Sequence, residues 1–191
     1  MSKSQIRQRA IESRRAIPAS RIASMSGDVQ KNLEALKEYQ EAKNIAVYVA
    51  KGDEVQTARI LERAISGGKS VAVPLVDVPS GTLLFFEVTS LADLSPGHFG
   101  VLEPKRGARP VPLSETDSVL VPLLAWDPRG HRIGYGKGYF DRALATRGNS
   151  LAIGLAFESQ RVERVPDQPY DVKLDILVTD KRVLRFSRSG A

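Results

Sequence analysis

The residues best suited to chemistry lie in a glycine-rich segment, residues 132–142, which reads Arg-Ile-Gly-Tyr-Gly-Lys-Gly-Tyr-Phe-Asp-Arg. The glycines alternate with other residues, and this spacing lets successive backbone N–H groups point at a single anion. The segment follows a predicted strand and precedes a predicted helix, whose N-terminus also attracts negative charge. We therefore predict a phosphate-binding loop. A tight strand-to-helix turn is the alternative explanation for the glycines alone.

Charged side chains in this segment suit a triphosphate and its metal ion. Arg132 and Lys137 supply positive charges that phosphate oxygens attract. Asp141 lies in the first turn of the predicted helix and offers the hard oxygen ligand that Mg²⁺ prefers; interaction with the helix dipole is its alternative role. The segment matches neither the Walker A pattern nor G-x-G-x-x-G. The predicted phosphate contacts therefore differ from those of P-loop and dinucleotide-binding folds.

The composition excludes several other chemistries. The 191 residues contain no cysteine, so thiolate nucleophiles, disulfides and Cys-ligated metal sites are ruled out. With 42% hydrophobic and 26% charged residues, the chain is typical of one globular domain. It has no apolar run of the roughly 20 residues that a membrane-spanning helix needs, and its N-terminus lacks the apolar stretch of a signal peptide. We expect a cytoplasmic protein without a membrane partner.

The formal net charge of +6 arises at the two ends of the chain. Residues 1–21 carry six basic side chains and one acidic one, and residues 181–191 carry four basic side chains and no acidic one. The segment between them carries more acidic than basic residues. Aromatic residues make up only 6% of the chain, so a stacking surface for nucleic acid is not indicated. We expect no nucleic-acid partner, and a basic nucleic-acid-binding protein is the alternative from another functional class.

Strands and helices alternate along the chain, which predicts an α/β fold. The segment 45–75 has the pattern of a strand–helix–strand crossover between parallel strands. The long loop 95–113 is rich in proline and glycine and has the length of a binding loop. Helices are predicted over 4–16, 20–42, 57–66 and 139–145, strands over 45–49, 70–73, 83–88, 118–122, 151–156 and 175–179, and at most a short strand over 99–102.

Several segments together resemble the 5-formyltetrahydrofolate cyclo-ligases, also called methenyltetrahydrofolate synthetases. The segment 132–142 looks like the signature of that family, and the similarity continues in the family's order over nearly the whole chain. It includes Lys3 and Arg7 and the segments 52–54, 103–104, 124–127, 153–157 and 165–180. The resemblance implies one domain over residues 1–191, an α/β/α sandwich of three layers with a mostly parallel central sheet. Sugar-phosphate isomerases and CoA transferases share this fold.

The resemblance also implies an enzyme that closes 5-formyltetrahydrofolate to 5,10-methenyltetrahydrofolate with ATP and Mg²⁺, releasing ADP and phosphate. An imino-phosphate on N5 is the implied intermediate, because phosphorylation turns a poor leaving oxygen into a good one. Such catalysis depends mostly on positioning and charge neutralisation. We expect a monomer whose partners are ATP and the folate, with or without a polyglutamate tail. An isomerase or transferase of the same fold that needs no ATP is the alternative.

The resemblance assigns roles to individual residues. Asp141 and Asp171 would be the Mg²⁺ ligands. Catalysis would involve Arg132, Lys137 and Tyr139. ATP would be bound by Lys3, Arg7, Arg132, Ile133, Gly134, Tyr135, Gly136, Lys137, Gly138, Tyr139 and Phe140. The folate would be bound by Lys51, Glu54, Gln56, Tyr135, Gly136, Lys137, Gly138 and Tyr139.

Some of these positions depart from the family pattern. Gln56 stands where an acidic residue is common, Lys51 where a small or apolar residue is expected, and Tyr135 where arginine or a long apolar chain is frequent. Phe140 replaces the second tyrosine of the signature. The departure at Gln56 bears most on substrate binding, because a carboxylate is the natural partner of the amino-pyrimidine edge of a pterin.

Overall fold

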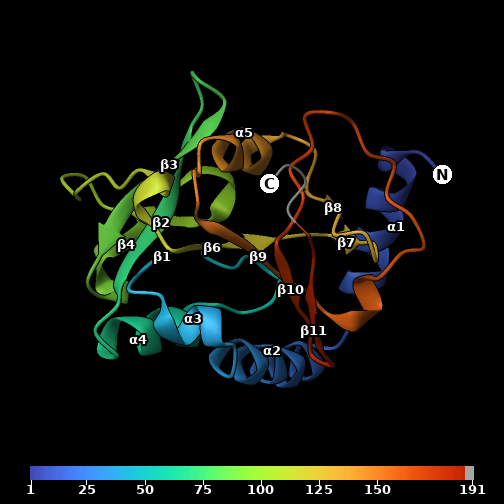
Figure 1. Cartoon of the computed structure of the whole chain (residues 1–191), viewed down its shortest axis with the longest axis horizontal. Helices are drawn as coiled ribbons and strands as arrows, with labels where there is room; N and C mark the ends of the chain where they lie inside the picture. The colour runs from blue at the N-terminus through green and yellow to red at the C-terminus, as the bar shows by residue number, and fades with distance from the viewer. Residues whose placement is uncertain (188–191) are drawn as a thin grey trace.

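A mostly parallel seven-stranded sheet forms the centre of the molecule, as the computed structural model of residues 1–187 shows (Figure 1). The strand order is β11-β10-β9-β6-β1-β2-β3, and only the edge strands β3 and β11 run antiparallel to their neighbours. The strands are β1 (Asn44–Val47), β2 (Ser70–Asp77), β3 (Thr82–Val88), β6 (Ser118–Pro122), β9 (Leu151–Leu155), β10 (Ile176–Val178) and β11 (Val183–Arg185).

Helices cover both faces of this sheet, so the predicted three-layer α/β/α fold is confirmed. One face is covered by α2 (Ala19–Glu34), α3 (Lys37–Glu41) and α4 (Ala58–Ser66), and the other by α5 (Tyr139–Ala145). The helix α1 (Lys3–Arg15) packs beside the sheet, where Ile6 contacts Ala125 and Ile133. No helix within residues 1–187 combines the length and apolar character needed to cross a membrane.

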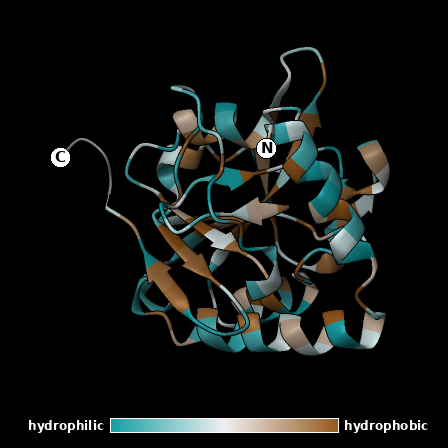
Figure 2. Cartoon of the chain, turned by 90° about the vertical axis from the view of Figure 1, so that its right-hand side faces the viewer, coloured by the Kyte–Doolittle hydropathy of each residue, from teal (hydrophilic) through white to brown (hydrophobic). Residues whose placement is uncertain are grey.

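The central strands form because their side chains are buried on both faces of the sheet. Ile45, Ala46 and Val47 of β1 are all inaccessible to solvent, and such continuous apolar runs are typical of covered parallel strands. Alternate residues enter two different cores, with Ile45 and Val47 facing α2–α4 and Ala46 facing the opposite layer. In Figure 2 the hydrophobic colouring is concentrated on the interior strands, whereas the outer loops are mostly hydrophilic.

The single helix predicted over 20–42 is wrong, because the chain forms two helices there. At Leu36 the backbone becomes extended, with φ −76° and ψ 123°, and this turns α3 away from the axis of α2. Both Leu36 and Tyr39 are thereby buried in the core, and the Gln40 side chain donates to the carbonyl of Glu34 at 2.8 Å, near the end of α2. The apolar spacing continues through the break, so helical periodicity did not reveal it.

The chain also forms short hairpins that the sequence analysis missed. In the loop 95–113, β4 (Leu94–Pro96) pairs with β5 (Leu102–Pro104), so the strand predicted near 99–102 lies slightly later. A second hairpin pairs β7 (Ala125–Trp126) with β8 (Arg132–Ile133), directly before the glycine segment. The remaining short elements are the 3₁₀ turns Leu91–Asp93, His98–Gly100, Leu113–Glu115 and Glu158–Gln160. Arg188, in the basic C-terminal segment, lies outside the described residues.

The turn of the β7–β8 hairpin is held by the buried carboxylate of Asp127. This carboxylate accepts from the backbone N–H groups of Arg129, His131 and Val165 at 2.9, 3.2 and 2.9 Å. Burial opposes the charge, but these hydrogen bonds and Arg129 outweigh it and lower the pKa of Asp127. Asp127 thus ties the segment that begins at Val165 to the hairpin, and this segment leads to Asp171.

Candidate functional site

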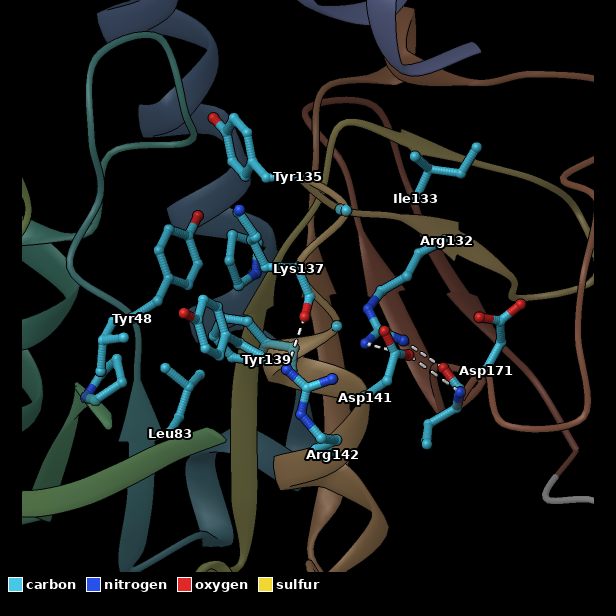
Figure 3. Close-up of a pocket in the computed structure, with 18 of the residues that line it drawn as sticks. Tyr48, Leu83, Arg132, Ile133, Tyr135, Lys137, Tyr139, Asp141, Arg142 and Asp171 are labelled. Atoms are coloured by element: carbon cyan, nitrogen blue, oxygen red, sulfur yellow. Dashed lines mark hydrogen bonds and ion pairs between the residues drawn. The ribbon is translucent and has the colours of Figure 1, made fainter. Parts of the chain in front are cut away.

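A cavity of about 920 Å³ lies at the carboxyl ends of β1 and β6, where Val49 and Pro122 line it. Binding sites of parallel α/β sheets usually lie at this edge of the sheet, and the volume is at the upper end of the range for small-molecule pockets. Most of the predicted site residues line this one cavity (Figure 3): Lys3, Arg7, Lys51, Glu54, Arg132, Ile133, Gly134, Tyr135, Gly136, Lys137, Gly138, Tyr139, Phe140, Asp141 and Asp171.

Gln56 is the predicted site residue that does not line the cavity. Its side-chain amide donates to the carbonyls of Gly52 at 3.0 Å and Glu54 at 2.7 Å. These bonds hold the loop that follows β1, because both acceptors lie within that loop. The structure therefore places Gln56 behind the lining residues, where it shapes the loop that presents Glu54.

One side of the cavity holds a cluster of opposite charges (Figure 3). The guanidinium of Arg132, which is 9% exposed, donates to Asp141 Oδ1 at 3.0 Å and to the carbonyl of Val172. The backbone N–H of Val172 donates to the same Asp141 oxygen at 3.2 Å. Burial lowers the pKa of Arg132, and the Asp141 carboxylate opposes that effect. Lys3 forms an ion pair with Asp171 beside this cluster.

Asp141 and Asp171 have the donor chemistry of a magnesium site completed by a substrate. Within residues 1–187 no group of three or more histidine, aspartate or glutamate side chains lies close enough to hold a metal alone. Mg²⁺ is usually bound by one or two carboxylates together with substrate phosphates and water. Two carboxylates beside Arg132 and Lys3 therefore fit a metal ion that arrives with a phosphorylated ligand.

The part of the glycine-rich segment that lies between β8 and α5, residues 134–138, is called the glycine loop below. It requires glycine at two positions for steric reasons. Gly136 has φ 93°, and a Cβ there would lie 2.9 Å from Cζ of Arg7. Gly138 has φ 69° and caps α5 in the left-handed conformation. Arg7 donates from Nε to the carbonyl of Gly134 at 2.9 Å, which ties α1 to the loop. Lys137 projects from the loop, and within residues 1–187 its ammonium forms no hydrogen bond or ion pair.

The opposite side of the cavity is aromatic and apolar. Tyr48, Leu83 and Tyr139 lie there (Figure 3). Phe99 adds a ring that is 57% exposed, and its centroid lies 6.5 Å from that of Tyr139. The backbone of Phe99 has φ 56°, and its carbonyl accepts from the Lys51 ammonium. Flat aromatic faces beside apolar side chains suit a planar heterocycle.

Three residues that line the cavity were not predicted from the sequence: Tyr48, Phe99 and Glu103. Phe99 and Glu103 belong to the loop whose length and glycines suggested binding, so the segment was detected but its residues were not. Glu103 is buried and accepts from the Val76 N–H at 3.1 Å. Tyr48 follows β1 in a continuous apolar run, and nothing in that run distinguishes a cavity wall from the core.

Glu54 brings a buried carboxyl group to the wall of the cavity. It is 6% exposed and accepts from the backbone N–H of Lys51 at 2.8 Å. Burial raises the pKa of Glu54, while the Lys51 hydrogen bond and the charge of Arg14 act in the opposite direction without cancelling it. Burial and the Glu54 charge also raise the pKa of Tyr135 to about 12, so this phenol stays protonated.

We expect Glu54→Gln to stabilise the fold at neutral pH. Because the pKa of Glu54 is raised in the folded state, the protonated carboxyl group stabilises the fold relative to the ionised one. This stabilisation is fully present below the unfolded pKa of 4.5 and is lost as pH rises through the folded pKa. The glutamine side chain does not ionise, so the variant does not lose stability in this way. Urea unfolding between pH 4 and pH 8 should show a stability advantage of the variant that grows with pH; an advantage that is absent or independent of pH would contradict the assignment.

Comparison with known proteins identifies what this chain is similar to. A model of the 5-formyltetrahydrofolate cyclo-ligase family matches residues 1–180. The 5-formyltetrahydrofolate cyclo-ligases of Haemophilus influenzae and Escherichia coli K12 are 36% and 32% identical to it, over 75% and 74% of this chain and 79% and 80% of theirs. The NMR structure of 5,10-methenyltetrahydrofolate synthetase from Aquifex aeolicus has a TM-score of 0.86 at 32% identity, covering 100% of this chain and 96% of that one.

Proposed function

This chain belongs to the 5-formyltetrahydrofolate cyclo-ligase family, and from that premise we propose that it uses Mg-ATP to close 5-formyltetrahydrofolate into 5,10-methenyltetrahydrofolate, releasing ADP and phosphate. The observation that carries the proposal is the division of one cavity into a charged side and an aromatic side. A nucleotide triphosphate suits the first and a pterin suits the second. Both substrates would thus meet at the glycine loop between them.

The proposed reaction has two steps. The formyl oxygen on N5 attacks the γ-phosphorus, the bond between that phosphorus and the bridging oxygen breaks, and ADP leaves. An imino-phosphate then remains on N5. N10 attacks its carbon, the carbon–oxygen bond to phosphate breaks, and N10 loses its proton, so that phosphate leaves and the ring closes. The enzyme needs no covalent nucleophile for this route, since positioning and charge neutralisation supply most of the catalysis.

The charged side of the cavity supports binding of the triphosphate. Lys3 and Arg7 line the cavity from α1 and Lys137 lines it from the glycine loop, and charge-assisted hydrogen bonds to phosphate are the strong ones. Asp141 and Asp171 would hold Mg²⁺, which supplies charge neutralisation at the phosphates when it is bound. Arg132 orients Asp141 through their 3.0 Å contact.

The aromatic side supports binding of the folate. Tyr139 and Phe99 would contact the flat pterin, and Glu54 would accept hydrogen bonds from its amino-pyrimidine edge. Lys51 lines the cavity, and its ammonium donates to the Phe99 carbonyl. Because Gln56 does not reach the cavity, Glu54 is the carboxylate that the loop after β1 offers to the substrate.

The decisive experiment mixes the protein with 5-formyltetrahydrofolate and Mg-ATP. We expect the conjugated methenyl chromophore to appear together with one ADP for each product formed. Parallel reactions without ATP and without Mg²⁺ should stay blank, and product formed without ATP would favour the ATP-independent alternative of the same fold. No product from folded protein with all components present would reject the proposal. Salt-sensitive binding to random DNA with no ATP binding would favour the nucleic-acid alternative.

A further inference from the structure

Arg14 is a buried cation that does not line the cavity. It lies in the last turn of α1 and is only 4% exposed. A buried guanidinium is costly unless acceptors replace its lost water. Here Asp53 Oδ1 accepts at 2.9 Å from Nε and lies 2.8 Å from the terminal nitrogen Nη2, and the carbonyl of Leu123 accepts at 3.3 Å. The hydroxyl of Tyr135 accepts from Arg14 at 2.5 Å.

Two of these acceptors, Asp53 and Tyr135, belong to different loops, and both loops contribute lining residues to the cavity. Asp53 precedes Glu54, a lining residue of the cavity, in the loop after β1. Tyr135 lies between two glycines of the glycine loop, and the Arg14 guanidinium also lies 5.8 Å from the centre of its ring. Arg14 is therefore the part of α1 that joins the two loops.

We infer that Arg14 is a positioning residue that couples ATP binding at the glycine loop to folate binding at the loop after β1. The inference rests on the proposed function, because that function places the ATP phosphates at the glycine loop and the amino-pyrimidine edge of the folate at the loop after β1. The planar Arg14 guanidinium contacts both loops, so a ligand that orders one loop also orders the other. The second ligand then binds a loop that is already ordered. The link to the glycine loop depends on the Tyr135 hydroxyl, which is the group that accepts from Arg14.

The test measures the affinity for 5-formyltetrahydrofolate with and without saturating Mg²⁺ and a non-hydrolysable ATP analogue, by titration calorimetry. In the wild-type protein we expect the nucleotide to tighten folate binding at least about fivefold, with the same factor in the reverse titration. Arg14→Lys keeps the charge but loses the planar fork, and we expect its coupling factor to fall below about twofold. Arg15→Lys, at the exposed neighbouring position, is the matched control and should retain the wild-type factor.

Tyr135→Phe provides a second variant that removes only the hydroxyl group. We expect it to lose coupling to the same extent, and the double variant to lose no more than either single variant. A purely structural role for Arg14 would lower the melting temperature and leave the coupling factor unchanged. An unchanged factor in either folded variant, or no coupling in the wild type, would overturn the inference. Failure of the wild type to form methenyl product with ATP would instead overturn the proposed function.

Discussion

Asp141→Asn should lower ATP-dependent turnover about 100-fold or more, because removing one preorganised charged or polar group from a reaction centre typically lowers the rate by this factor. The substitution removes one negative charge from the proposed Mg²⁺ site and changes almost nothing in shape. The asparagine oxygen can still accept from Arg132 and from the Val172 N–H, which contact Asp141 at 3.0 and 3.2 Å. The affinity for 5-formyltetrahydrofolate should change little, because Asp141 lies on the charged side of the cavity (Figure 3).

Steady-state kinetics measures the expected loss of turnover, and titration calorimetry checks that the folate affinity is unchanged. The concentration of Mg²⁺ needed for half-maximal turnover should also rise in the variant, since a neutral amide is a weaker ligand for a hard cation. Asp28→Asn is the matched control, because Asp28 is exposed on α2, which covers the other face of the sheet. Unchanged turnover in Asp141→Asn would reject the metal assignment.

Lys137→Ala should raise the KM for ATP about 10- to 100-fold, which corresponds to the loss of one hydrogen bond to a charged group. The Lys137 ammonium has no partner within residues 1–187 and lies in the cavity, so it is available to a ligand. Because the side chain is exposed, we expect the free energy of unfolding to stay within about 0.5 kcal/mol of wild type.

Initial rates at varied ATP concentration measure this effect, and chemical unfolding checks the stability. Lys137→Arg should recover part of the ATP affinity, since it restores the charge with a different geometry. Lys31→Ala removes an exposed lysine from α2 on the opposite face and should leave KM unchanged. If Lys137→Ala bound ATP as the wild type does, phosphate binding by the glycine loop would lose its main support.

Much of the fold was predictable because it follows from local patterns. The buried run around Ile45 and the crossover to β2 each depend on residues close together in the sequence. The break at Leu36 was not predictable in this way. There the apolar spacing suits a continuous helix, and only packing against the sheet favours the extended backbone that buries Leu36 and Tyr39.

The site was predictable in its residue types and much less in its contacts. Alternating glycines with Arg132, Lys137 and Asp141 indicate phosphate chemistry within one short segment. The ion pair of Lys3 with Asp171 joins residues 168 positions apart, and no local pattern reports such a distance. Gln56 illustrates the opposite case, because the family resemblance assigned it to the folate, whereas the folded loop keeps its side chain out of the cavity lining.

The sequence by itself determined the class of fold, the glycine loop and the family resemblance, because periodicity, turn chemistry and motif spacing are properties of neighbouring residues. Only the tertiary structure decided which charges meet. The six basic side chains near the N-terminus each add one positive charge, and composition alone does not distinguish their roles. In the folded chain Lys3 and Arg7 face the cavity, whereas Arg14 is buried behind it between Asp53 and Tyr135. Burial and long-range partners distinguish these cations, and both arise only when α1 packs against the sheet.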